Sequence, residues 1–167
     1  MADNVPVGVV MGSDSDWAVM NKCVDQLKAF GIGCEARVIS AHRTPDAAHE
    51  YAATAAERGL KVIIAAAGMS AALSGVLAAN TTLPVVGVPM VSGPLGGIDA
   101  ALSTMQMPPG IPVGCMAING AANAAVYAAR ILAVSDAELA GRLEQFKADQ
   151  AKKVRDKDAK LVAEIKG

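Results

Sequence analysis

Residues 61–67 of this chain are Lys-Val-Ile-Ile-Ala-Ala-Ala, and this short run decides the predicted fold. An apolar run rich in β-branched residues is typical of a strand that is buried on both faces of a parallel sheet. Residues 5–11 have the same character, and each run is followed by a glycine and then by a stretch with helical character. The chain therefore alternates between strands and helices.

The same patterns extend along most of the chain. They predict strands at residues 5–11, 34–40, 61–67, 83–88 and 113–118, and helices at about residues 16–30, 44–59, 69–80, 98–105, 120–133 and from residue 135 onward. The hydroxyl of Thr44, followed by Pro45, is expected to cap the second helix. The order of elements predicts an α/β fold, a flavodoxin-like, three-layer, doubly wound parallel sheet of about five strands with a long C-terminal helix.

Residues 1–134 are predicted to form one α/β catalytic domain, because no linker or charge block divides them. Residues 135–167 are predicted to be a C-terminal helix of the same domain, which starts with the capping box Ser-Asp-Ala-Glu at residues 135–138. Its apolar positions form a stripe too narrow for the core of a monomer, namely Leu139, Leu143, Phe146, Val154, Leu161 and Ile165. We interpret the helix as an arm laid on a neighbouring subunit, and a solvated, fraying helix is the alternative.

Composition argues against several classes of function. The formal net charge is -1, and the few aromatic residues are scattered, so nucleic acid is not expected as a partner. The three cysteines lie far apart and form no CxxC pair, which is typical of reduced thiols. Neither a signal-peptide pattern nor an apolar run of membrane-spanning length is present. We therefore expect a soluble cytoplasmic protein that does not bind membranes.

Polar, glycine-rich segments follow the predicted strands, at the edge where parallel sheets bind ligands. After the first strand come residues 12–16, Gly-Ser-Asp-Ser-Asp, whose backbone N–H groups and serine hydroxyls suit a phosphate group. The alternative is that Ser13 and Ser15 only cap the following helix. Asp16 would repel a phosphate, so its carboxylate is expected to accept from sugar hydroxyls or to stabilise the first helical turn.

The second strand leads into residues 40–44, Ser-Ala-His-Arg-Thr. Arg43 can complete a phosphate site from there, and the alternative is a solvated surface arginine. His42 is the acid–base candidate, because an imidazole can exchange a proton near neutral pH from this strand-end position. The other histidine, His49, lies inside the next predicted helix and is expected to be a surface or packing residue.

Several sharper motifs are absent from the sequence or incomplete. There is no phosphate loop of the GxxxxGK type and no GxGxxG after the first strand, so ATP and dinucleotides are not expected as ligands. Two histidines without a cysteine pair provide no metal-ligand spacing. Residues 68–72, Gly-Met-Ser-Ala-Ala, are close to a nucleophile elbow, which makes a serine hydrolase using Ser70 an alternative, although both histidines precede that serine. A further alternative is a module that binds a phosphosugar or nucleotide without turnover and has no use for His42.

The motifs at residues 12–17 and 40–46 are specific when taken together. With residues 83–89 and 105–114, they show that the chain resembles the bacterial N5-carboxyaminoimidazole ribonucleotide mutases and the related aminoimidazole ribonucleotide carboxylases of purine synthesis. The resemblance runs from about residue 5 to residue 143. It implies formation of 4-carboxy-5-aminoimidazole ribonucleotide without a metal or organic cofactor, with a ribonucleotide and carbon dioxide as ligands. It also implies a homo-octamer with active sites at subunit contacts.

The resemblance further implies roles for individual residues. The family's phosphate ligands match Ser13, Ser15 and Arg43, its ribose ligand matches Asp16, and its proton shuttle matches His42. The substrate-binding residues predicted from these loops are Gly12, Ser13, Ser15, Asp16, Ser40, Ala41, Arg43, Gly68, Ser70, Ala71 and Leu73.

The third loop departs from the mutase pattern. Mutases carry Gly-Gly-Ala-Ala-His-Leu-Pro-Gly there, whereas residues 68–75 of this chain are Gly-Met-Ser-Ala-Ala-Leu-Ser-Gly, so Ala72 replaces a histidine. This loop is similar to that of enzymes that add carbon dioxide directly to aminoimidazole ribonucleotide. We predict the mutase reaction, in which carbon dioxide is released from the carbamate and recaptured at carbon 4, with direct carboxylation as the alternative.

Overall fold

The structure is a computed structural model that describes residues 5–166, and it confirms the predicted α/β fold. Five strands form a single sheet in the order β2-β1-β3-β4-β5, and every neighbouring pair is parallel. This strand order is the flavodoxin-like one. The strands are β1 (Val7–Met11), β2 (Cys34–Val38), β3 (Val62–Gly68), β4 (Val85–Met90) and β5 (Gly114–Cys115).

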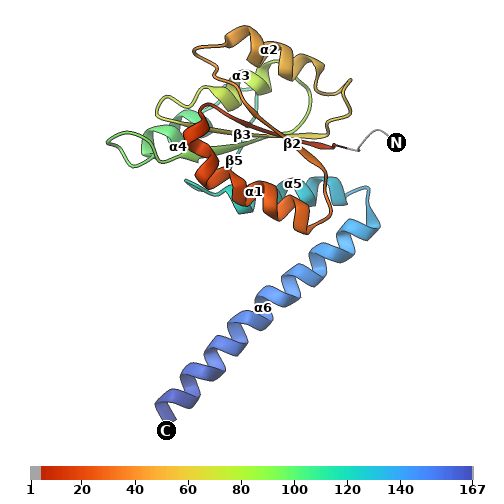
Figure 1. The fold of residues 1–167 in the computed structure, drawn as a ribbon, viewed down its shortest axis with the longest axis vertical. Coiled ribbons are helices and arrows are strands. Elements are labelled where there is room, and N and C mark those ends of the chain that lie inside the picture. The colour runs from red at the N-terminus through yellow and green to blue at the C-terminus, as the bar shows by residue number, and fades with distance from the viewer. Residues whose placement is uncertain (1–4, 167) are drawn as a thin grey trace.

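Helices cover both faces of this sheet (Figure 1). They are the short 3-10 helix η1 (Asp14–Asp16) and the α-helices α1 (Trp17–Ala29), α2 (Pro45–Thr54), α3 (Leu73–Ala79), α4 (Ile98–Met105), α5 (Ala121–Ala133) and α6 (Ala137–Lys166). Helices α1 and α5 pack together on one face, and α2 and α3 pack on the other. Helix α4 packs on β4 beside α3, where Gly87 leaves room for Thr104 and Ser74. The fold therefore has the three predicted layers.

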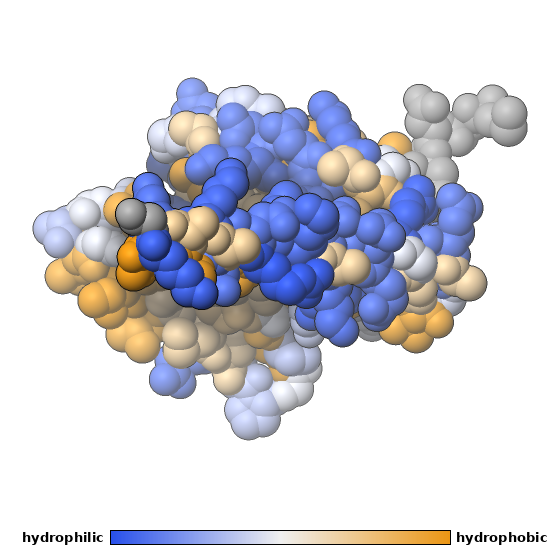
Figure 2. Space-filling view, turned by 90° about the horizontal axis from the view of Figure 1, so that it is seen from below, coloured by the Kyte–Doolittle hydropathy of each residue, from blue (hydrophilic) through white to orange (hydrophobic). Residues whose placement is uncertain are grey.

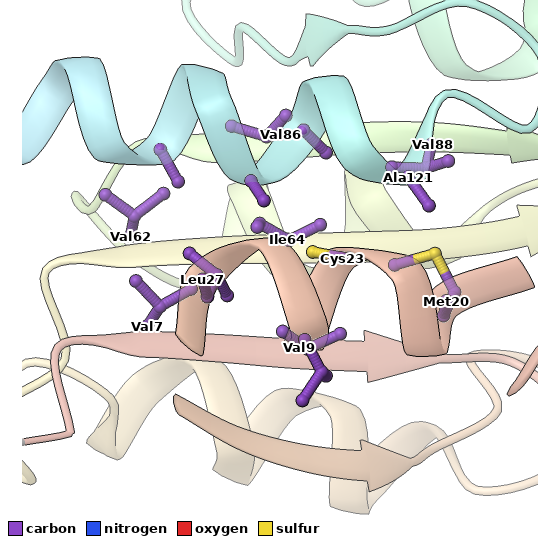
Figure 3. Close-up of a cluster of buried hydrophobic side chains, with 14 of the residues drawn as sticks. Val7, Val9, Met20, Cys23, Leu27, Val62, Ile64, Val86, Val88 and Ala121 are labelled. Carbon is purple, nitrogen blue, oxygen red and sulfur yellow. The ribbon is translucent and has the colours of Figure 1, made fainter. Parts of the chain in front are cut away.

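Small side chains allow the helices to approach the sheet closely. Figure 3 shows Val9 and Ile64 of the sheet pointing into the space between the strands and helices α1 and α5. Leu27 and Cys23 fill that space from α1, and α5 contributes a row of buried alanines, Ala121, Ala124, Ala125, Ala128 and Ala129. This packing fixes the height of both helices above the sheet.

The parallel arrangement decides where a ligand can bind. Because all five strands run in the same direction, their carboxyl ends and the loops that follow them lie along one edge of the sheet. The pairing continues to that edge, since the N–H of Gly12 donates to the Ala66 carbonyl at 3.0 Å and the N–H of Ile39 donates to the Met11 carbonyl at 2.9 Å. The loops after β1, β2 and β3 therefore start side by side.

Some predicted element boundaries were wrong. The last strand was expected over residues 113–118, but β5 contains only Gly114–Cys115. Single hydrogen bonds continue beside β4, and the chain then turns into α5 at Asn119, whose φ is 57°. The second helix ends at Thr54 and is followed by a turn that closes at Gly59, where φ is 91°.

Two predicted helix caps were also wrong. The hydroxyl of Thr44 does not cap α2, because it donates to the Ser40 carbonyl at 2.9 Å and closes the preceding loop instead. At α6 the cap is Asp136 and not Ser135, since the Asp136 carboxylate accepts from the N–H of Leu139 at 2.9 Å. A carboxylate at this position also stabilises the positive end of the helix dipole.

Only the first part of α6 packs against the domain. Leu139 is buried, and the ring of Phe146 contacts Phe30 edge-on at 5.2 Å between centroids. Beyond this contact the helix projects away from the body of the molecule (Figure 1). Val154 and Ile165 are 67% and 77% exposed. In the described part of the chain, no helix has both the length and the apolar character needed to cross a membrane.

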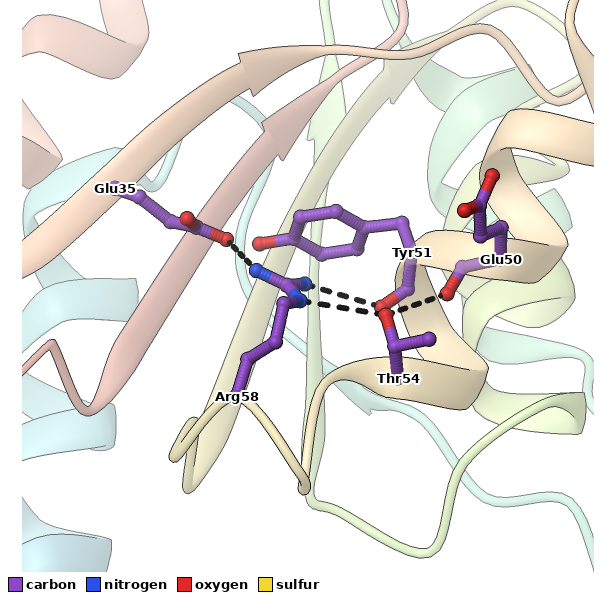
Figure 4. A network of polar contacts seen from close by, with 5 residues as sticks. All are labelled: Glu35, Glu50, Tyr51, Thr54 and Arg58. Carbon is purple, nitrogen blue, oxygen red and sulfur yellow. Dashed lines mark hydrogen bonds and ion pairs between the residues drawn. The ribbon is translucent and has the colours of Figure 1, made fainter.

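A polar network lies between β2 and α2, on the face opposite α1 (Figure 4). The guanidinium of Arg58 donates to the Glu35 carboxylate at 2.7 Å and to the Tyr51 carbonyl at 3.2 Å, and it lies over the Tyr51 ring. The hydroxyl of Tyr51 is buried and has no hydrogen-bond partner among residues 5–166. It points at β1, where Gly8 provides the space that it needs.

Gly8→Ala is expected to destabilise the fold by about 1–3 kcal/mol, because the added methyl group would overlap the Tyr51 hydroxyl. Tyr51→Phe removes that unpaired hydroxyl, so the double variant should recover a large part of the loss. Urea unfolding of the parent, both single variants and the double variant measures this coupling as a double-mutant cycle. Additive single effects would show that the two residues do not compete for space.

The Glu35–Arg58 pair is expected to make stability depend on pH. Burial acts to raise the pKa of Glu35, but the hydrogen bond and charge of Arg58, together with Tyr51 and the charge of Arg37, outweigh it and lower that pKa overall. The pair thus stabilises the fold above the unfolded pKa of about 4.3, and this contribution disappears as the pH falls through the lower folded value. Glu35→Gln should flatten the decline of stability between about pH 5 and pH 3 by no more than ~1 kcal/mol, because the pair is partly exposed.

Chemical unfolding at several pH values tests this expectation. The matched control is Glu57→Gln, an exposed carboxyl that forms no ion pair within residues 5–166. A Glu35 variant with the same acid profile as this control would contradict the role given to the pair.

Candidate functional site

A polar cleft lies beyond the carboxyl ends of β1, β2, β3 and β4, and its volume is about 200 Å³. Its lining residues are Gly12, Ser13, Ser15, Asp16, Ser40, Ala41, His42, Arg43, Ala67, Gly68, Met69, Ser70, Ala72, Leu73 and Ser92. All residues predicted from the sequence as site residues are brought together here except Ala71, which is buried below the loop and does not line the cleft. The remaining four lining residues were not predicted.

The loop after β1 presents two hydroxyl groups to the cleft. Ser15 Oγ donates to Ser13 Oγ at 2.8 Å, and the backbone N–H of Ser15 donates to the same oxygen at 3.3 Å. Ser13 therefore caps the short helix η1, as the alternative interpretation of this loop expected. Both serines still lie in the wall of the cleft, where their hydroxyls can turn toward a ligand.

Asp16 is the acidic residue of the same wall. Burial raises the pKa of its carboxyl, a backbone hydrogen bond from Ser13 lowers it, and the charge of Asp14 raises it further. The net shift is upward, which means that the free carboxylate is not fully compensated by the groups around it. Hydroxyl donors from a ligand would provide that compensation.

The loop after β2 is closed by Ser40 and Thr44. The N–H of Ser40 donates to Thr44 Oγ1 at 3.0 Å, and the N–H of Arg43 donates to Ser40 Oγ at 3.2 Å. These bonds hold the backbone on both sides of His42, whose imidazole and the neighbouring Arg43 guanidinium are exposed in the cleft. An acid–base group and a fixed positive charge thus share one rigid turn.

The loop after β3 forms the opposite wall. Met69 has a left-handed φ of 55°, and the next turn is closed by N–H donation from Ala71 to the Met69 carbonyl at 2.9 Å. Ser70 and Ala72 line the cleft beside Met69. No hydrogen bond joins Ser70 to a histidine in the described chain, so the nucleophile arrangement that a serine hydrolase needs is not formed.

His49 lies away from the cleft, where it is exposed and its Nδ1 contacts the Asn80 side-chain oxygen at 2.6 Å, which links α2 to the end of α3; it was predicted to be a surface or packing residue. Ser92 was missed, although it follows a strand in the same way as the other loops. Within residues 5–166, no group of three or more His, Cys, Asp or Glu side chains could hold a metal ion.

The fold and cleft together define a class of protein, a flavodoxin-like α/β protein with a ligand cleft that combines hydroxyl donors, an arginine and one histidine. Comparison with known proteins narrows this class. The family model of AIR carboxylase matches residues 6–153, so this chain belongs to the AIR carboxylase family.

Relatives of known name agree with this membership. N5-carboxyaminoimidazole ribonucleotide mutase of Aquifex aeolicus is 54% identical over 138 residues, which are 83% of this chain and 83% of that protein. The mutase of Mycobacterium tuberculosis is 52% identical over 155 residues, covering 93% of this chain and 89% of that one.

Solved structures agree as well. The crystal structure of Treponema denticola PurE has a TM-score of 0.81 and 33% sequence identity, and the match covers 93% of this chain and 97% of that one. A substituted form of PurE2 from the same organism has a TM-score of 0.85 and 31% identity, over 93% of this chain and 96% of that one.

Proposed function

We propose that this chain is a mutase that converts N5-carboxyaminoimidazole ribonucleotide into 4-carboxy-5-aminoimidazole ribonucleotide in purine synthesis. The observation that carries the proposal is the cleft, in which the only histidine of the site shares one cavity with Ser13, Ser15 and Arg43. The mutases of Aquifex aeolicus and Mycobacterium tuberculosis, more than half identical to this chain, support the same reaction.

The two loops next to β1 and β2 are suited to the phosphate and ribose. The guanidinium of Arg43 can pair with two phosphate oxygens, and the hydroxyls of Ser13 and Ser15 can donate to the same group. The carboxylate of Asp16 accepts from the ribose hydroxyls, which supplies the compensation that it lacks in the free protein. Gly12, Ser40 and Ala41 line the same half of the cleft, and Gly68, Ser70 and Leu73 line the half toward which the imidazole base would extend.

His42 is the group that moves protons. In its protonated form it gives a proton to the exocyclic nitrogen as the carbamate carbon–nitrogen bond breaks and carbon dioxide leaves. Carbon 4 of the imidazole then attacks the retained carbon dioxide, and the neutral histidine removes the proton left on carbon 4. The histidine ends in its starting state, so one imidazole serves both steps.

Direct carboxylation of aminoimidazole ribonucleotide is the second candidate. Ala72 lines the cleft at the position where the mutase pattern has a histidine, so a methyl group stands in place of a second proton carrier. The capture of carbon dioxide at carbon 4 and the loss of its proton are common to both reactions. The two candidates differ mainly in the source of the carbon dioxide.

The carboxyl donor is tested by two rate measurements. We expect fast product formation from the N-carboxylated substrate in buffer depleted of carbon dioxide, and slow formation from aminoimidazole ribonucleotide with dissolved carbon dioxide. His42→Asn should abolish turnover almost completely, by about 10²–10⁴-fold, while substrate binding is largely kept, because the amide retains the size of the side chain but cannot shuttle a proton. His49→Asn is the matched control and should leave turnover unchanged, because His49 lies away from the cleft.

Each alternative has its own outcome in this experiment. Fast direct carboxylation alone would make the protein a carboxylase, and turnover of neither substrate would remove the assignment. Unchanged activity of His42→Asn would remove this histidine from the mechanism. Ester cleavage that is lost in Ser70→Ala would instead support the hydrolase alternative.

The protein is further proposed to work as a homo-octamer in which α6 is an interface arm of the domain formed by residues 1–134. A cleft of about 200 Å³ is smaller than the ~300–1,000 Å³ typical of enclosed ligand pockets, so one chain does not enclose a nucleotide. Hydrophobic residues also gather on the left of Figure 2, the side on which Figure 1 places α4. Leu95, Ile98, Leu102 and Met105 are each 49% exposed or more.

The apolar stripe of α6 provides the test of this assembly. Leu161→Glu with Ile165→Glu is expected to shift the sedimentation coefficient from that of eight chains to a smaller species, because both side chains are more than half exposed in one chain. Ala159→Glu with Ala163→Glu adds the same charge on another side of the helix and should leave the assembly intact. A monomeric parent, or equal behaviour of both pairs, would contradict the proposal.

A cytoplasmic location completes the proposal. Cys23, Cys34 and Cys115 are free thiols, as expected in a reducing compartment. Burial raises the pKa of Cys23 to about 12, which keeps this thiol protonated and unreactive. Cell fractionation with an antibody against the chain tests the location.

A further inference from the structure

Ser92 lies in the loop after β4 and is the only lining residue of the described cleft that this strand contributes. Its side chain is partly buried. No hydrogen bond involving the Ser92 hydroxyl occurs in the part of the chain that the structure describes. A sheltered hydroxyl at a ligand cleft therefore retains its donor and its acceptor capacity.

The last residue of β3, Gly68, leaves room for Ser92 to approach. A methyl group on Gly68 would lie only 2.5 Å from Ser92 Cβ and 3.4 Å from Ser92 Oγ, so only glycine leaves room for the serine in its present place. The Met69 side chain lies beside the next residue, because a methyl group on Gly93 would be 3.7 Å from Met69 Cγ. Met69 and Gly68 thus flank the serine from the neighbouring strand end.

The loop after β5 holds Ser92 from the other side. Asn119 Oδ1 accepts from the N–H of Val91 at 3.0 Å, and the N–H of Asn119 donates to the Pro89 carbonyl at 2.8 Å. Asn119 makes these two hydrogen bonds from a left-handed conformation with a φ of 57°. This conformation costs an asparagine less free energy than it costs most other residues. The backbone just before Ser92 is therefore fixed by an element that does not itself line the cleft.

We propose that Ser92 is a substrate-contacting residue whose hydroxyl donates a hydrogen bond to the carboxylate carried on carbon 4 of the imidazole, with Asn119 as its positioning residue. This inference rests on the proposed function and extends it to the loop after β4, from which no site residue was predicted. No covalent step involves Ser92. Its hydroxyl orients the carbon dioxide during capture and the carboxylate of the product.

The order of the strands explains why the carboxylate is the group contacted. The phosphate-binding side chains follow β1 and β2, whereas Ser92 follows β4, which is separated from β1 by β3. Neighbouring strands are about 4.8 Å apart, so Ser92 lies roughly 10 Å along the edge from the β1 loop. A nucleotide whose phosphate is held near Ser13 extends its base toward this end. Ala72 has no polar group there, so Ser92 and Ser70 are the hydroxyl donors of that wall.

Binding of two nucleotides that differ only in this carboxylate tests the inference. Calorimetry compares 4-carboxy-5-aminoimidazole ribonucleotide with 5-aminoimidazole ribonucleotide on the parent and on Ser92→Ala. We expect the carboxylated nucleotide to lose about 10- to 100-fold in affinity, as a hydrogen bond to a charged group implies, while the other keeps its affinity within about twofold. The value of kcat/KM should fall by a similar factor.

The matched control is Ser135→Ala, an exposed serine between α5 and α6 that should change neither affinity. Asn119→Ala should reproduce the selective loss of Ser92→Ala, although its side chain touches no ligand. Equal weakening of both nucleotides in Ser92→Ala, or weakening of neither, would overturn the inference. A parent that binds the carboxylated nucleotide selectively but turns over neither substrate would remove the proposed function, and the Ser92→Ala comparison would still decide this inference.

Discussion

The parallel register of β1, β3 and β4 is the constraint on which the rest of the molecule depends. These strands have buried residues on both faces, so a slip of one residue would exchange the two sets of side chains between the two cores. Met11 and Val38, the last residues of β1 and β2, are paired with each other, and Met11 is also paired with Ala66 of β3. The register that satisfies the cores is therefore the same register that places the loops of His42 and Ser13 in one cleft.

A second feature of this sequence is that glycines allow neighbouring elements to approach each other closely. At the sheet, Gly87 allows Thr104 of α4 and Ser74 of α3 to pack over β4. At the cleft, Gly68 allows Ser92 to lie against the neighbouring loop. Filling either space would move a whole element, because protein interiors are close-packed and have little free volume. Glycines therefore determine both the packing of the core at β4 and the shape of the cleft.

The sequence was sufficient to predict the order of elements, since the strand and helix patterns were strong. The structure brings all of the predicted site residues except Ala71 to one cleft. The failures of the sequence concern the boundaries of some elements and the local hydrogen bonds that close loops and cap helices. Thr44 and Ser135 have the right chemistry to cap helices, but Thr44 has a better partner in Ser40, and Asp136 competes successfully at α6. Ser92 follows a strand as the other site residues do, but the sequence does not show that Asn119 of another loop holds the backbone beside it.

The two left-handed residues other than glycine in residues 5–166, Met69 and Asn119, follow strands β3 and β5 on either side of β4. Asn119 is tied to the loop between them by its hydrogen bond to Val91, and the Met69 side chain lies near Gly93 of that loop. Such conformations cost of order 1 kcal/mol and persist only where the surroundings over-determine them. The two strained residues thus lie in the loops after β3 and β5, which flank the β4 loop that carries Ser92. The strain is therefore best understood as the cost of holding the β4 loop in place before the ligand arrives, so that little ordering remains to be done on binding.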